Sequence, residues 1–80
     1  MTRDYYADAR DIATLLQQAG LVSEAATLVD AIEGGSTGTE ILMALRWHLD
    51  RIEKVASVID AQTRRRMVDL SQAISMALGQ

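Results

Sequence analysis

Hydrophobic positions in this chain recur at intervals of three and four residues, the spacing that places apolar side chains on one face of an α-helix. No proline interrupts the pattern. The pattern predicts an all-α protein, a small four-helix bundle forming a single domain over residues 1–80. Its expected parts are a helical hairpin, a glycine-rich loop, a long third helix and a C-terminal helix. The predicted helices cover approximately residues 4–19, 23–33, 38–58 and 61–78.

The first two predicted helices are separated by a short turn, which favours an antiparallel hairpin. Gly20 follows the first apolar stripe at the position where a left-handed residue commonly ends a helix. We expect Ser23 to cap the second helix, with Glu24 in its first turn, where the helix dipole favours negative charge.

Three of the five glycines lie in residues 34–38, just before the third predicted helix. Thr37 and Glu40 have the spacing of a capping box, in which the threonine hydroxyl accepts from the Glu40 N–H and the Glu40 side chain returns to the Thr37 N–H. A phosphate-binding loop needs a lysine before its Ser/Thr and a preceding strand. This segment has neither, so we interpret it as a connection between helices.

The end of the third helix is ambiguous in the sequence. No glycine or proline lies between Thr39 and Leu78, so one continuous helix, and hence a three-helix protein, is sterically allowed. The apolar phase slips between Ile59 and Met67, and Asp60 can cap a new helix. Three arginines early in that helix oppose the helix dipole. We favour four helices and keep three as the alternative.

Composition narrows the functional classes. The chain has no cysteine, a net charge of −3 and no apolar run of membrane-spanning length, and its N-terminus lacks a signal-peptide pattern. We therefore expect a soluble, cytoplasmic protein that contacts neither membrane nor nucleic acid. Aromatic residues make up only 4% of the chain, so the core is built from aliphatic side chains. Small helical proteins of this kind often gain burial by oligomerising, which suggests a homodimer.

His48 is the single histidine, and it lies on the apolar stripe of the third helix. General acid–base catalysis needs an orienting partner and a cleft, and a lone histidine without cysteine makes a poor metal site. We predict no catalytic residue, no metal and no cofactor. A small enzyme using His48 is the least favoured function.

Trp47 lies off the main stripe, on a second apolar face with Met43 and Val58. Arg51 follows it by four residues, within reach of the indole ring. Tryptophan and arginine are enriched among residues that dominate binding energy at interfaces. Trp47 is therefore either part of the core of the bundle or a contact for a partner protein or a second copy of the chain.

Arg64, Arg65 and Arg66 form the one run of like charge. Successive helical residues fan out by about 100°, which predicts a solvated helix face. An anionic protein partner at these three arginines is the weaker alternative.

The first 33 residues resemble one tetratricopeptide-type hairpin. Ile12, Ala13 and Leu16 stand at its large-small-large positions in the first helix. The matching positions of its turn and second helix are Gly20, Ala25, Val29 and Ile32. The whole pattern is also similar to small uncharacterised bacterial helical proteins, some of them similar to immunity proteins of polymorphic-toxin systems; residues 15–20, 25–32 and 40–46 carry this likeness. It implies a stoichiometric binder of another protein.

These observations predict a non-catalytic protein-interaction module, immunity-like or adaptor-like and self-associating. The alternative is a helix-turn-helix regulator or accessory protein built on the first two helices. Residues 23–33 contain no Lys, Arg, Asn or Gln to read base edges, which disfavours that alternative.

Overall fold

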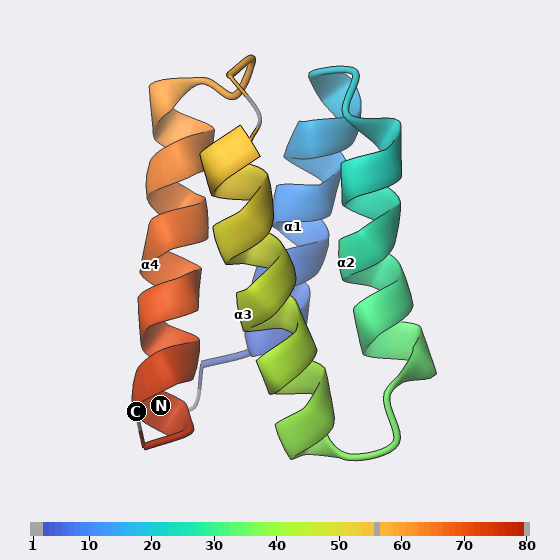
Figure 1. The fold of residues 1–80 in the computed structure, drawn as a ribbon, viewed down its shortest axis with the longest axis vertical. Coiled ribbons are helices and arrows are strands. Elements are labelled where there is room, and N and C mark those ends of the chain that lie inside the picture. The colour runs from blue at the N-terminus through green and yellow to red at the C-terminus, as the bar shows by residue number, and fades with distance from the viewer. Residues whose placement is uncertain (1–2, 56, 80) are drawn as a thin grey trace.

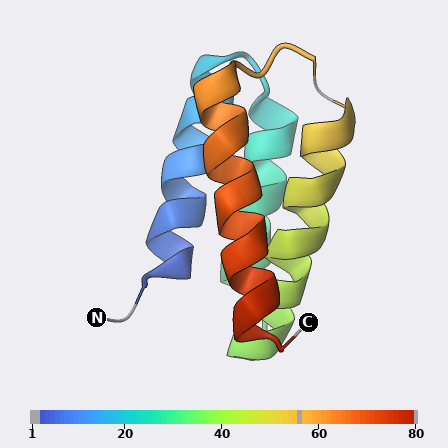
Figure 2. The ribbon, with the colours of Figure 1, turned by 90° about the vertical axis from the view of Figure 1, so that its left-hand side faces the viewer.

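The computed structural model describes residues 3–55 and 57–79, which contain four helices and no strand. The helices are α1 (Tyr5–Gln18), α2 (Val22–Gly34), α3 (Gly38–Val55) and α4 (Ala61–Ala77). Consecutive helices run antiparallel, and α4 closes the ring by packing on α1 (Figures 1 and 2). The predicted all-α four-helix fold is confirmed.

The core runs along the inside of this ring and draws on all four helices. Its most completely buried large side chains are aliphatic: Ile12, Leu16, Leu28, Leu45, Leu49, Met67, Leu70 and Ile74. Small residues such as Ala9 and Ala25 are buried among them and let the helices approach closely. The aromatic rings of Tyr5 and Tyr6 are only half-buried, at one end of the bundle.

The turn between α1 and α2 lies one residue earlier than the sequence suggested. Gly20 has a φ of 87°, and its N–H donates to the carbonyl of Gln17 while the N–H of Leu21 donates to that of Leu16. These two bonds form a Schellman motif, which satisfies the last carbonyls of α1. Leu21 then serves directly as the N-cap residue of α2, without a side-chain cap.

The prediction that Ser23 caps α2 is therefore wrong. The helix already begins at Val22, so Ser23 lies inside its first turn. The Schellman motif places the half-buried Leu21 at the boundary, so an apolar residue occupies the N-cap position of α2.

The glycine-rich connection supplies the N-terminal cap of α3. The hydroxyl oxygen of Thr37 accepts from the N–H of Glu40 at 3.2 Å, which confirms the hydroxyl half of the predicted capping box. The return bond from the Glu40 side chain stays a prediction. Gly35 lies tightly against Ile41, where a Cβ would overlap the isoleucine side chain, so this glycine lets the chain turn closely under α3.

The break between α3 and α4 is also confirmed. Asp60 caps α4 by accepting from the N–H of Thr63 at 2.6 Å. However, α3 ends at Val55 rather than at residue 58; Ala56 lies outside the described residues, and residues 57–58 form a turn. Ile59 follows outside any helix and is buried in the core. Its burial directs the chain away from the α3 helix before Asp60 starts the next one.

Candidate protein-interaction surface

Trp47 projects from the side of α3 opposite the core. At about 100° per residue it lies about 160° around the helix from the buried Leu45. Its side chain is 55% exposed, and Met43 and Val55 are 47% and 70% exposed. Met43, Trp47, Arg51 and Val55 follow one another at four-residue steps, and we call these four residues the outer strip. The structure thus places Trp47 on the surface rather than in the core.

The indole of Trp47 has two described ring contacts, both from its own helix. The guanidinium carbon of Arg51 lies 5.2 Å from the ring centroid, a cation–π distance. The imidazole of His48 meets the indole edge-on, with centroids 5.0 Å apart and planes at 83°. These contacts orient the ring while leaving more than half of it in solvent.

Val58 does not belong to this surface, contrary to the prediction. It would share the face of Trp47 only if α3 continued through residue 58, whereas the helix ends at Val55. Val58 instead lines a hollow with Leu15 and Thr63, beside the start of α4. Val55 takes the place on the outer strip that the sequence had given to Val58.

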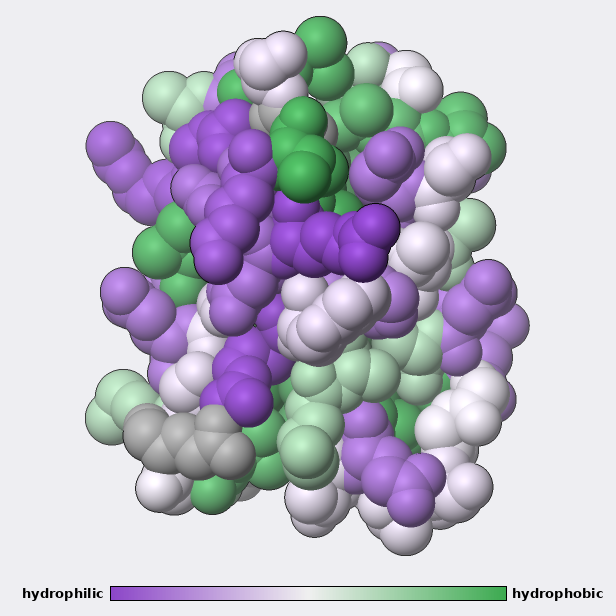
Figure 3. All heavy atoms as spheres, in the orientation of Figure 1, coloured by the Kyte–Doolittle hydropathy of each residue, from purple (hydrophilic) through white to green (hydrophobic). Residues whose placement is uncertain are grey.

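Charged residues flank the outer strip on the side of α4. Arg46, Asp50 and Lys54 line a surface hollow together with Met43 and Trp47. The Ser71 hydroxyl of α4 donates to Asp50 Oδ1 at 2.7 Å. Figure 3, which views α3 from the front, shows hydrophilic residues gathered over the upper parts of α3 and α4.

On the side of α2 the strip borders a groove between two helices. Ser23 and Thr27 of α2 line it opposite Trp47, His48 and Val55. His48 also borders the hollow farther along the same groove. Partial burial lowers the pKa of His48, and the nearby charge of Arg51 lowers it further. His48 therefore lies beside the outer strip, and its lowered pKa favours the neutral imidazole.

The three arginines of α4 do not form one patch. Arg64 reaches α3, where it donates to the carbonyl oxygen and, at 3.2 Å, to Oε1 of Glu53. Arg66 pairs with Asp11 of α1 at 3.8 Å. The side chains diverge as helical geometry predicts, and two of them interact with acidic groups of this chain.

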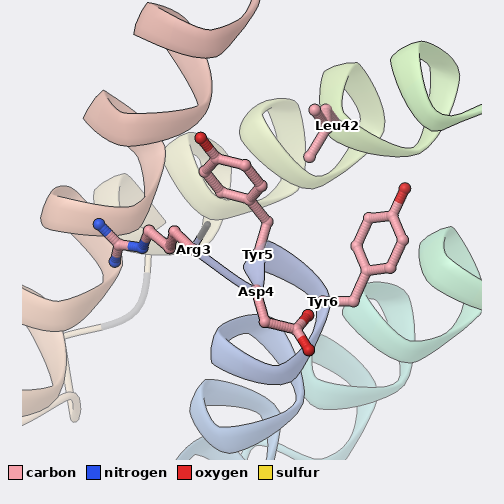
Figure 4. A pocket seen from close by; sticks show the side chains of 5 residues that line it. All are labelled: Arg3, Asp4, Tyr5, Tyr6 and Leu42. Atoms are coloured by element: carbon pink, nitrogen blue, oxygen red, sulfur yellow. The ribbon is translucent and has the colours of Figure 1, made fainter. Parts of the chain in front are cut away.

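A separate hollow opens at the start of α1, lined by Tyr5, Tyr6 and Leu42 with Arg3 and Asp4 (Figure 4). Both tyrosines point from α1 toward α3, on either side of Leu42. Arg3 is paired with the carboxylates of Asp8 and Asp69, at 2.7 and 2.8 Å, and hydrogen bonds to both raise its pKa.

Two kinds of feature bear on metal and membrane binding, a group of metal-ligating side chains and a membrane-spanning helix. Within residues 3–55 and 57–79, no three or more His, Cys, Asp or Glu side chains are grouped so that they could hold a metal ion. Over the same ranges, no helix has both the length and the apolarity to cross a bilayer.

The outer strip is thus the surface that combines an exposed aromatic ring, flanking apolar side chains and concentrated charge. No protein-family model, curated protein or solved structure matches this chain.

Proposed function

We propose that the protein is a non-catalytic protein-interaction module, which binds a partner through the outer strip of α3. The observation that carries the proposal is the exposure of Trp47, the only tryptophan of the chain. Burying such a ring at an interface releases a large apolar area from water, and its orientation by Arg51 lowers the entropy cost of that burial. Tryptophan and arginine are the residue types most enriched at the energetic centres of interfaces.

The arrangement of the first two helices favours this proposal over a helix-turn-helix regulator. In that motif the helices meet at about 90–120°, whereas α1 and α2 lie antiparallel along their lengths (Figure 1). The second helix carries Glu24, Asp30 and Glu33 and no basic residue, which would repel phosphates. An acid–base role for His48 is disfavoured because its described ring contact is with Trp47 rather than with a carboxylate.

The module would act in the cytoplasm, in an immunity-like or adaptor-like role. A second copy of the chain, paired through α3 or α4, is one partner of this kind. Static light scattering over a range of micromolar concentrations tests that form: a rise in apparent mass toward the dimer supports it, and a constant monomer mass contradicts it.

Affinity capture with matched variants tests the interaction itself. Trp47→Ala removes the ring from the outer strip, while Met76→Ala removes a more exposed apolar side chain from α4. We expect a partner retained by the wild type and by Met76→Ala to be lost from Trp47→Ala, with unchanged helical circular dichroism. Identical sets of captured proteins for all three would refute the assignment to the outer strip.

A further inference from the structure

We infer that the partner segment bound at the outer strip is an acidic amphipathic helix, with carboxylates flanking its apolar anchors. This inference rests on the proposed function and names the chemistry of the partner at the same surface.

The charge around Trp47 is opposite to that of the whole molecule. The hollow beside the strip is lined by three cations, Arg46, Arg51 and Lys54, and by one carboxylate, Asp50, a local balance of +2 in a chain of net charge −3. The hydrogen bond from Ser71 holds the Asp50 carboxylate toward α4. Glu24 lies across the strip, on the α2 side, so the two hollows together carry a balance of +1. The net charge thus suggests a basic partner, whereas the binding surface itself favours an acidic one.

The shape of the surface fits a helix. Met43 and Val55, at the two ends of the outer strip, are twelve residues apart, about 18 Å along the axis of α3. A partner helix of similar length lying along α3 can place apolar residues at three- and four-residue spacing into the hollows on both sides of Trp47. Acidic residues at the edges of its apolar face would then meet Lys54 and Arg46.

A second copy of this chain fits the strip less well. Pairing two outer strips about a two-fold axis places two surfaces of positive charge against each other. Pairing through α4 would leave the outer strip open, since its residues belong to α3. Like charges facing each other oppose association, so the charge pattern favours a different, acidic chain.

Selection of binders from a random library of displayed 16-residue peptides tests the inference without knowledge of the natural partner. We expect the enriched peptides to carry net negative charge, to show apolar residues at helical spacing, and to lose binding to Trp47→Ala. Because the chain has one tryptophan, a blue shift of its emission on titration with an enriched peptide reports burial at this site directly.

Two charge-reversal variants give the matched control. Lys54→Glu and Arg65→Glu change the net charge equally, but only Lys54 borders the outer strip. We expect Lys54→Glu to weaken the binding of an enriched acidic peptide about tenfold. Arg65→Glu should weaken this binding less than about twofold, because charges at the rim of an interface act locally at physiological salt.

The outcomes separate the inference from the function on which it rests. Enriched peptides that need Trp47 but carry basic or neutral flanks overturn the acidic partner and leave the interaction module standing. If a single-stranded oligonucleotide binds more tightly than the enriched peptides and its binding depends on Trp47, the acidic partner is overturned in favour of nucleic acid. Failure to enrich any peptide that depends on Trp47 contradicts both proposals.

Discussion

Ser71 and Asp50 join α4 to α3 through a hydrogen bond of 2.7 Å between the serine hydroxyl and Asp50 Oδ1. The serine is buried and the aspartate is exposed, so the bond reaches from the edge of the core to the surface. The bond connects the packing of the bundle with the charge beside Trp47, because it holds in place the one carboxylate that lines the hollow next to this ring.

Removing this hydroxyl should cost stability. We expect Ser71→Ala to lower the free energy of unfolding by about 1 kcal/mol, the usual net value of a hydrogen bond, since water can still reach the exposed carboxylate. Ser75→Ala, one turn farther along α4, is the matched control and should change it less. Urea unfolding of the three proteins measures the difference, and equal losses for both variants would contradict a specific role for the Ser71–Asp50 bond.

Two adjacent glycines should respond differently to the same substitution. A Cβ at Gly35 would overlap the side chain of Ile41 and lie 3.2 Å from the carbonyl oxygen of Ala31, whereas a Cβ at Gly34 meets nothing within 4 Å. We expect Gly35→Ala to destabilise the fold by about 1–3 kcal/mol through overpacking. Gly34→Ala should change stability by less than about 0.5 kcal/mol or increase it. Thermal unfolding tests this contrast, and the reverse order would show that Ile41 can move aside.

The cap at Asp60 should make stability depend on acidity. Hydrogen bonds from Thr63 to the charged carboxylate lower its pKa below the ordinary value of 3.8. A lowered pKa in the folded state stabilises the fold above that ordinary value, and this contribution is lost as the pH falls through the lowered pKa. Asp60→Ala should therefore unfold at a lower temperature than the wild type at pH 7. The difference between their melting temperatures should narrow toward pH 2.

Asp60→Asn provides the control for charge, because asparagine keeps an acceptor for the cap. It should retain more of the stability at pH 7 than Asp60→Ala. The difference in melting temperature between Asp60→Asn and Asp60→Ala should also vary less with pH than the difference between the wild type and Asp60→Ala. A constant gap between wild type and Asp60→Ala from pH 7 to pH 2 would mean that the carboxylate charge does not contribute.

His48 should produce a second pH dependence, at higher pH. Burial, aided by Arg51, lowers its pKa below 6.5, so the unfolded chain binds a proton more readily than the folded one. Stability is then lost as the pH falls from 6.5 through the lowered folded-state pKa, and it is retained above 6.5. Urea titrations at pH 7.5 and 5 should show a larger decrease for the wild type than for His48→Gln. Equal decreases would place the pH dependence elsewhere.

Periodicity predicted the helices well because each stripe had to face a common core. The phase slip before Met67 and the capping chemistry of Asp60 together located the break between α3 and α4. The same reasoning failed at Ser23, because a Schellman motif closes α1 with backbone bonds and puts the apolar Leu21 at the N-cap position of α2. Local residue preferences could not show that Leu21 would both complete the Schellman motif of α1 and serve as the N-cap residue of α2.

The candidate surface was predicted only in part. Helical phase placed Trp47 away from the main stripe and brought Arg51 near its ring. Whether a neighbouring helix covers that side depends on how the ring of helices closes, which is a long-range property. Val58 was misplaced because Ile59 enters the core and ends α3 early, and no glycine or proline marks that point. Val55 could have been found from the sequence, since it follows Trp47 and Arg51 at the same four-residue step.

The double role of Leu21 limits how this chain can change. One residue inserted between Gly20 and Leu21 would separate these two roles, because the inserted residue would stand where Leu21 now donates to the carbonyl of Leu16. Leu28 would then stay in the core only with a longer connection before α2. Substitutions on the exposed sides of this hairpin leave both roles of Leu21 intact. This joint therefore tolerates a change of side chain better than a change of length.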